Sequence, residues 1–134
     1  MKVLIVGAGK LGYQLAEAMN NEDIDVTLMD IDGDKLERIS DHLDVLTVEA
    51  NGIQIGALKE LNIESYDLLV AATNSDEVNI LICTLAKNLA CKKTIARIRE
   101  PEYIEDLGFV KNHLGIDHII NPDLATAIEI ERYI

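Results

Sequence analysis

Three glycines near the amino terminus have the spacing of a phosphate-binding loop. Gly7, Gly9 and Gly12 lie in the segment G-A-G-K-L-G, directly after the apolar run V-L-I-V. At this spacing the first glycine permits a tight turn, the second lets the backbone approach a pyrophosphate, and the third lets a helix pack closely on a strand. A helix that opens in this loop would direct its free N–H groups and partial positive charge at the anion.

An aspartate follows where such loops have an acidic partner. Asp30 lies 18 residues after Gly12, close to the separation of about 20 residues in dinucleotide-binding domains. Its carboxylate would accept hydrogen bonds from ribose hydroxyls and would repel a 2′-phosphate, which favours NAD or adenosine ligands over NADP. The alternative is a solvated turn aspartate. Asp32, beside Gly33, better fits the cap of the next helix.

Further polar residues come directly after later apolar runs. Asn51-Gly52 suits either a plain turn or a contact with adenine. Thr73 and Asn74 are expected across the switch point of the sheet from the glycine loop. Asn74 and Glu77 also have the spacing of a capping box, and capping does not exclude binding.

Two arginines mark the end of another run, in I-A-R-I-R-E-P. Arginine is costly to bury without a partner, and a guanidinium can clamp phosphate with two hydrogen bonds. We therefore expect Arg97 to have a ligand or interface role. Arg99 faces the opposite way and is expected to pair with an acidic residue. Lys10, inside the glycine loop, either meets a terminal phosphate or extends into solvent.

The elements that must position these residues alternate regularly. Short runs of consecutive apolar residues, typical of strands buried on both faces, are separated by segments of helical periodicity. We expect strands at 2–6, 25–30, 44–49, 67–72, 94–98 and 118–120, and helices at 10–21, 34–42, 53–61, 75–90, 101–112 and 123–133. The alternation predicts an α/β, Rossmann-like, doubly wound fold with a parallel six-stranded sheet in the order 3-2-1-4-5-6.

Composition limits the class of protein. The chain has 134 residues, enough for one domain, and a formal net charge of −12. Nucleic acid is not an expected partner, because phosphate backbones require a basic face. No apolar run approaches the ~20 residues of a membrane span. The two cysteines have no metal-type spacing, which fits a reducing cytosol.

Groups that could perform catalysis are expected at the wrong edge of the sheet. Ligands of open α/β sheets bind at the carboxyl ends of the strands. His42, His113, His118 and Cys91 all fall at helix ends or strand starts, on the opposite edge. Cys83 is expected in the core. The sequence therefore predicts a nucleotide cradle without a general acid or base.

The motifs together resemble a known family. M-K-V-L-I-V-G-A-G-K-L-G, V-T-L-M-D-I-D, A-A-T-N-S-D-E-V-N and I-A-R-I-R-E-P-E-Y are similar to the N-terminal domain of TrkA proteins, also called KTN or RCK domains. The resemblance spans almost the whole chain. It implies one NAD-binding domain over 1–134, without the smaller C-terminal ligand domain of the family.

The resemblance also implies a function and a set of site residues. It implies a non-enzymatic cytoplasmic regulator that binds NAD(H), or ATP or ADP, forms homodimers or rings, and lies beneath a membrane potassium-transport subunit that it gates by nucleotide-dependent conformational change. Gly7, Ala8, Gly9, Lys10, Leu11 and Gly12 would form the pyrophosphate loop, and Asp30 would bind the adenosine ribose. Asn51 and Gly52 would lie near adenine, and Thr73, Asn74 and Arg97 on the phosphate–nicotinamide side.

Two alternatives remain open at this point. The chain could be the cofactor-binding half of an NAD-dependent dehydrogenase whose substrate domain is absent, or a nucleotide-binding module that serves another partner.

The final segment adds a separate expectation. Apolar residues at helical spacing, from Leu124 to Ile134, either pack on the sheet or contact a second subunit or domain.

Overall fold

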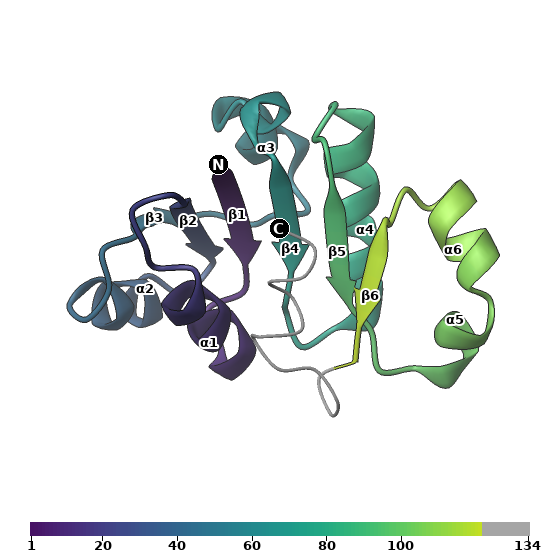
Figure 1. Cartoon of the computed structure of the whole chain (residues 1–134), viewed down its shortest axis with the longest axis horizontal. Helices are drawn as coiled ribbons and strands as arrows, with labels where there is room; N and C mark the ends of the chain where they lie inside the picture. The colour runs from purple at the N-terminus through teal and green to yellow at the C-terminus, as the bar shows by residue number, and fades with distance from the viewer. Residues whose placement is uncertain (122–134) are drawn as a thin grey trace.

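The chain folds around a single parallel sheet (Figure 1). The computed structural model describes residues 1–121, so the predicted helix at 123–133 and its apolar stripe lie outside the described residues. The strands are β1 Lys2–Val6, β2 Asp25–Asp30, β3 Leu46–Glu49, β4 Leu68–Ala71, β5 Thr94–Arg97 and β6 His118–Ile120. They match the six predicted runs to within two residues at each end.

The sheet order is β3-β2-β1-β4-β5-β6, and every pair is parallel. This confirms the predicted topology. The order reverses between β1 and β4, whose register pairs Val6 with Ala71. The glycine loop after β1 and the loop after β4 therefore leave the same edge of the sheet on neighbouring strands, and a crevice opens between them.

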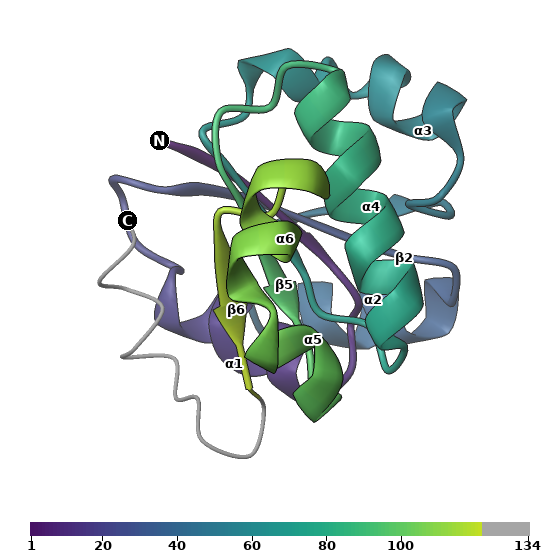
Figure 2. The ribbon, with the colours of Figure 1, turned by 90° about the vertical axis from the view of Figure 1, so that its right-hand side faces the viewer.

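Helices connect the strands and cover both faces of the sheet. They are α1 Lys10–Ala18, α2 Gly33–Ser40, α3 Ile55–Glu60, α4 Asp76–Asn88, α5 Pro101–Glu105 and α6 Leu107–His113, with a 3-10 turn at Ile63–Ser65. Residues of α1 and α2 pack on one face of the sheet, and residues of α3, α4 and α6 pack on the other. Figure 2 shows α1 and α4 on opposite sides of the strands.

The central strands are buried on both faces. Val3, Leu4 and Ile5 of β1 are fully buried, as are all four residues of β4. Alternate residues of β1 belong to the two separate apolar cores, one on each side of the sheet. Consecutive apolar residues in these runs therefore reflect burial from both sides, as expected for a parallel sheet.

Two helical predictions were wrong in detail. The predicted helix at 101–112 is two helices, because Asp106 has φ −109° and ψ 53°, outside the helical region. Asp106 ends α5 and precedes α6, a position that suits a residue whose side chain competes for backbone hydrogen bonds. The predicted helix at 53–61 is shorter, and the chain continues from it through the 3-10 turn.

An ion pair fastens β6 to the rest of the sheet. Lys87 Nζ lies 2.7 Å from Asp117 Oδ2, which also accepts a hydrogen bond from Thr94 N at 2.8 Å. Thr94 Oγ1 donates to Gly115 O at 2.7 Å. Burial acts to raise the pKa of Asp117, but the ammonium of Lys87 and the Thr94 N–H outweigh it and hold that pKa below its usual value.

Candidate functional site

A cleft of about 550 Å³ opens at the carboxyl ends of the central strands. The last residues of β1 and β2 contribute to it, as do the first residues of the loops that follow β1, β2, β3 and β4. Its lining residues are Val6, Gly7, Gly9, Asp30, Ile31, Asp32, Lys35, Ala50, Asn51, Gly52, Ile53, Ala72, Thr73, Asn74, Ser75, Val78 and Ile82. The cleft thus lies where open α/β sheets bind ligands.

Two glycines of the loop are required by the fold itself. Gly7 has φ +113°, and a Cβ there would come within 2.7 Å of the Ala72 carbonyl oxygen. A Cβ on Gly12 would collide with the carbonyl of Gly7. Both glycines are therefore explained by backbone conformation or close packing, without reference to a ligand.

Gly9 is different. Its backbone has φ −79° and ψ −162°, which any residue can adopt, and a Cβ there would meet no protein atom within 4 Å. Gly9 is the N-cap of α1 and lies exposed in the cleft. Neither strain nor packing accounts for a glycine here, whereas a ligand approaching the backbone at the start of the helix would.

The carboxylate of Asp30 fastens the glycine loop to the end of β2. Its Oδ2 accepts a hydrogen bond from Ala8 N at 2.7 Å, and its Oδ1 accepts one from Asp32 N at 2.8 Å. Each carboxylate oxygen has a second lone pair, so these bonds leave acceptor capacity for ribose hydroxyls. Asp32 accepts from the N–H groups of Asp34 and Lys35, which confirms it as the cap of α2.

The loop after β4 is held from behind by buried polar groups. Arg97 is only 8% exposed, and its Nη1 donates to Thr73 O at 2.8 Å and to Asn74 Oδ1 at 3.0 Å. Arg97 does not line the cleft. Its guanidinium therefore supports the loop that does, and the ligand or interface role expected from the sequence stays a prediction.

The capping-box interpretation of Asn74 is wrong. Ser75 is the N-cap of α4, and its hydroxyl accepts a hydrogen bond from Val78 N at 3.2 Å. Asn74 is not the cap; its Oδ1 accepts a hydrogen bond from Arg97, and the residue lines the cleft. Arg99 was expected to pair with an acidic residue. The contact found with one is from its backbone N–H, which donates to Asp76 Oδ1 at 3.0 Å.

The predicted site residues fall into three groups. Those that line the cleft are Gly7, Gly9, Asp30, Asn51, Gly52, Thr73 and Asn74. Ala8 and Lys10 border a separate groove between α1 and α2. Leu11 packs against the apolar core, Gly12 is buried in α1, and Arg97 lies behind the β4–α4 loop.

Two exposed isoleucines of the cleft were missed from the sequence. Ile31 is 71% exposed and Ile53 is 36% exposed, and both line the cleft on the side of β2 and β3. Each directly follows a residue that the sequence did single out, Asp30 and Gly52. An apolar residue just past a strand end was the available signal, because a large exposed side chain there has no core to fill.

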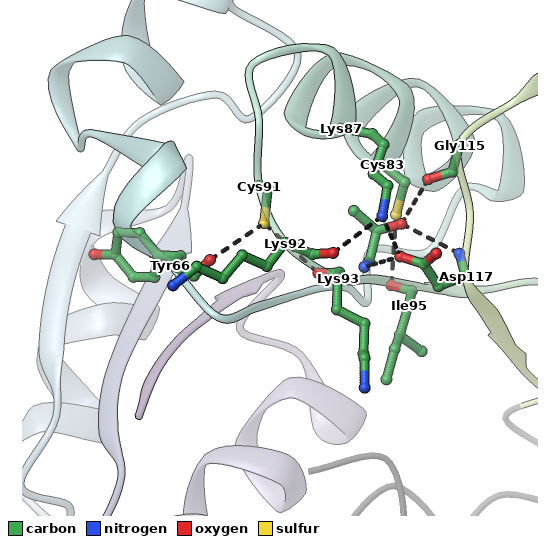
Figure 3. Close-up of polar contacts among 10 residues, drawn as sticks. Tyr66, Cys83, Lys87, Cys91, Lys92, Lys93, Ile95, Gly115 and Asp117 are labelled. Carbon is green, nitrogen blue, oxygen red and sulfur yellow. Dashed lines mark hydrogen bonds and ion pairs between the residues drawn. The ribbon is translucent and has the colours of Figure 1, made fainter.

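The two cysteines do not line this cleft. Cys83 and Cys91 are buried, and burial raises the pKa of both thiols, so neither is a ready nucleophile. In Figure 3 Cys83 lies beside Ile95, whose carbonyl oxygen is 3.5 Å from its sulfur, and Cys91 lies between Tyr66 and Lys93. Within residues 1–121, no three His, Cys, Asp or Glu residues are grouped so that they could hold a metal ion.

The histidines also lie outside the lining of the cleft. His42 follows α2, His113 ends α6 against the ring of Phe109, and His118 begins β6. Burial and the nearby charges of Lys111 and Lys93 lower the pKa of His118. None of the three lines the cleft.

In the part of the chain that is described, no helix combines the length and hydropathy needed to cross a membrane.

Two of the relatives found by sequence comparison are potassium uptake proteins by name. Trk system potassium uptake protein homolog 1 of Methanosarcina mazei is 39% identical over 97% of this chain and 33% of its own length. The homolog from Methanothermobacter thermautotrophicus is 37% identical over the whole chain and 60% of its own length. The chain thus spans about a third to three-fifths of these two relatives.

Solved structures share the fold. The TrkA-N domain of the inner membrane protein ybaL from Escherichia coli has a TM-score of 0.78 at 17% identity, over 98% of this chain and 92% of its own. The GsuK channel bound to NAD has a TM-score of 0.74 at 18% identity, over 89% of this chain and 21% of its own. The sequence profile described as the TrkA-N domain matches residues 3–122. This chain therefore belongs to the TrkA-N domain family.

Proposed function

We propose that this chain is the nucleotide-binding regulatory domain of a Trk-type potassium transport system, with NAD(H) as its ligand and ATP or ADP as alternatives. The observation that carries the proposal is Gly9, a glycine that the fold does not require, at the mouth of a cleft of about 550 Å³. The relatives are named as Trk system potassium uptake proteins, and this is the reason for proposing a potassium transport system.

The residues of the cleft fit the parts of a dinucleotide. The N–H groups at the start of α1 would hold the pyrophosphate beside Gly9, and Asp30 would accept from the adenosine ribose. Ile31 and Ile53 would lie against adenine, near Asn51 and Gly52. Thr73 and Asn74 would face the second half of the ligand. When bound, NAD(H) would supply a ligand that differs between its oxidised and reduced forms.

The proposed role is regulation rather than turnover. A nucleotide that bridges the loops after β1 and β4 would favour one arrangement of these loops, and a partner that contacts the same arrangement would sense the nucleotide. The partner would be a membrane potassium-transport subunit, with the domain acting as a homodimer or ring on the cytoplasmic side. Solved structures of similar fold are described as bound to NAD, ADP and AMP, which supports adenine nucleotides as the ligand class.

Two measurements on the purified chain test the proposal. Calorimetry with NADH, NAD, NADPH and ATP should give saturable binding of at least one adenine nucleotide, without NADH oxidation when keto acids are added. Affinity purification from membranes should recover a potassium-transport subunit in a nucleotide-dependent amount. Binding of no nucleotide would contradict the ligand, and steady NADH turnover would instead support the dehydrogenase alternative.

A further inference from the structure

A fully buried asparagine ties the cleft to a distant part of the chain. Asn79, in the second turn of α4, has an exposed fraction of 0%. It is the last residue of the segment T-N-S-D-E-V-N, but it does not line the cleft. A buried amide is costly unless its polar atoms are all paired, so the hydrogen bonds of this side chain define its role.

The side chain of Asn79 bonds on one side to the cleft loop. Its Oδ1 accepts from Thr73 N at 2.9 Å and from Thr73 Oγ1 at 2.6 Å, and its Nδ2 donates to Thr73 O at 3.1 Å. Three polar atoms of one residue are thus held by one side chain. The position of Thr73, and with it the backbone leading to Asn74, is fixed from beneath the cleft.

The same amide bonds on its other side to the end of β5. Nδ2 of Asn79 also donates to Arg97 O at 2.9 Å. Arg97 in turn donates from Nη1 to Thr73 O at 2.8 Å. The β4–α4 loop and the last residue of β5 are therefore linked twice, once through each side chain.

A second contact extends this link into the next connection. Asp76, in the first turn of α4, accepts hydrogen bonds from Arg99 N at 3.0 Å and from Glu100 N at 2.8 Å. Glu100 is the residue that precedes α5. The start of α4 therefore holds both the cleft loop, through Asn79, and the β5–α5 junction, through Asp76.

We propose that Asn79 is a positioning residue that couples the nucleotide cleft to the β5–α5 junction. It holds Thr73 and Asn74 in the arrangement that receives the ligand, and a ligand seated on that loop orders residues 97–100 through the same contacts. The inference rests on the proposed nucleotide binding. It predicts that nucleotide binding changes the position or order of α5 and the surface around it, because α5 begins directly after the β5–α5 junction.

Hydrogen exchange on the unaltered chain tests the coupling directly. Saturating NADH should slow exchange at the Thr73 amide and also at the Arg99 and Glu100 amides, which donate to Asp76 outside the cleft. Slowed exchange at Thr73 without any change at Arg99 and Glu100 would overturn the proposal. If NADH does not bind, the same measurement is made with the adenine nucleotide that calorimetry shows to bind. Binding of no adenine nucleotide at all would overturn the proposed function and this inference with it, so the two failures are distinguishable.

Substitution separates positioning from simple stabilisation. Asn79→Asp keeps the shape and the acceptor for Thr73 but replaces the Nδ2 donor, and Asn79→Ala removes both. In either variant that folds, NADH affinity should fall about 2- to 30-fold, with loss of the NADH effect at Arg99 and Glu100. Asn88→Ala is the control, because Asn88 is an exposed asparagine of the same helix whose Nδ2 donates to Thr84 O at 2.8 Å, away from the cleft.

The two roles predict different results below the melting temperature. A purely structural Asn79 would give a variant with a lower Tm but an unchanged NADH affinity and an intact effect at Arg99 and Glu100. That result in a folded variant would overturn the proposal. If both variants fail to fold, the exchange measurement on the unaltered chain still decides it.

Discussion

Replacing Gly9 with alanine should separate binding from folding. The added Cβ meets no protein atom within 4 Å, and the backbone at φ −79° accepts alanine without strain. Alanine is a poorer N-cap than glycine by about 0.5–1 kcal/mol. It also restricts the unfolded chain, which offsets about 0.4–1 kcal/mol. The free energy of unfolding should therefore change by less than about 0.5 kcal/mol, and Tm by less than about 3 °C.

The same methyl group should weaken nucleotide binding strongly. It would occupy the space through which a pyrophosphate approaches the N–H groups at the start of α1. Loss of one hydrogen bond to a charged group costs about 1.5–3 kcal/mol. The dissociation constant for NADH should therefore rise about 10- to 150-fold, while the protein remains folded.

Calorimetry with NADH and thermal unfolding of the same preparation would measure both effects. Gly108→Ala is the matched control, because a Cβ there also meets nothing within 4 Å and Gly108 lies in α6, away from the cleft. The control should bind NADH as the unaltered chain does. Unchanged NADH affinity in Gly9→Ala would refute the reasoning, because it would show that the nucleotide does not approach the backbone at Gly9.

Three other perturbations have defined outcomes. Gly12→Ala should destabilise the fold by about 3 kcal/mol or more, because its Cβ would collide with the Gly7 carbonyl; a urea midpoint within error of the unaltered chain would contradict this. Asp30→Ala should weaken NADH binding by about 1.5–3 kcal/mol and reduce the preference for NADH over NADPH. Calorimetry measures both affinities, and an unchanged ratio of the NADH to the NADPH affinity would show that the carboxylate does not bind the ribose. The lowered pKa of Asp117 means that the ion pair with Lys87 contributes its full stability above the ordinary carboxyl pKa of 3.8 and loses it as pH falls through the lowered value. Urea midpoints at about pH 6 and about pH 3 should therefore differ less in Asp117→Asn than in the unaltered chain, and equal differences would argue against this contribution.

The sequence predicted the fold well because burial on both faces leaves a strong signal. The runs V-L-I-V and L-L-V-A are apolar without alternation, and both became central strands. Strand order followed from the alternation of elements and from the glycine loop after the first strand. The break at Asp106 left a weaker signal, since a single aspartate in a helical pattern is common and only the tertiary path decides whether the helix continues.

The site was predicted in outline but not in its supporting contacts. Residues directly after strands were placed in the cleft by topology alone, as Asn51 and Thr73 show. Arg97 was expected to have a ligand or interface role, because its charge and its place at a strand end can be read from the sequence. Its contacts with Thr73 and Asn74 were not visible, because they depend on how the β4–α4 loop folds back. Asn79 was missed for the same reason, since a polar residue inside a helix has no periodic signal.

The account depends most directly on whether Gly9 marks a ligand's path. A calorimetric titration of NADH into the unaltered chain and into Gly9→Ala, each shown by thermal unfolding to be folded, is the decisive measurement. The account predicts saturable binding to the unaltered chain and binding at least about tenfold weaker to the variant. Equal affinity for the two proteins, or no binding of NADH, NAD or ATP to the unaltered chain, would contradict it.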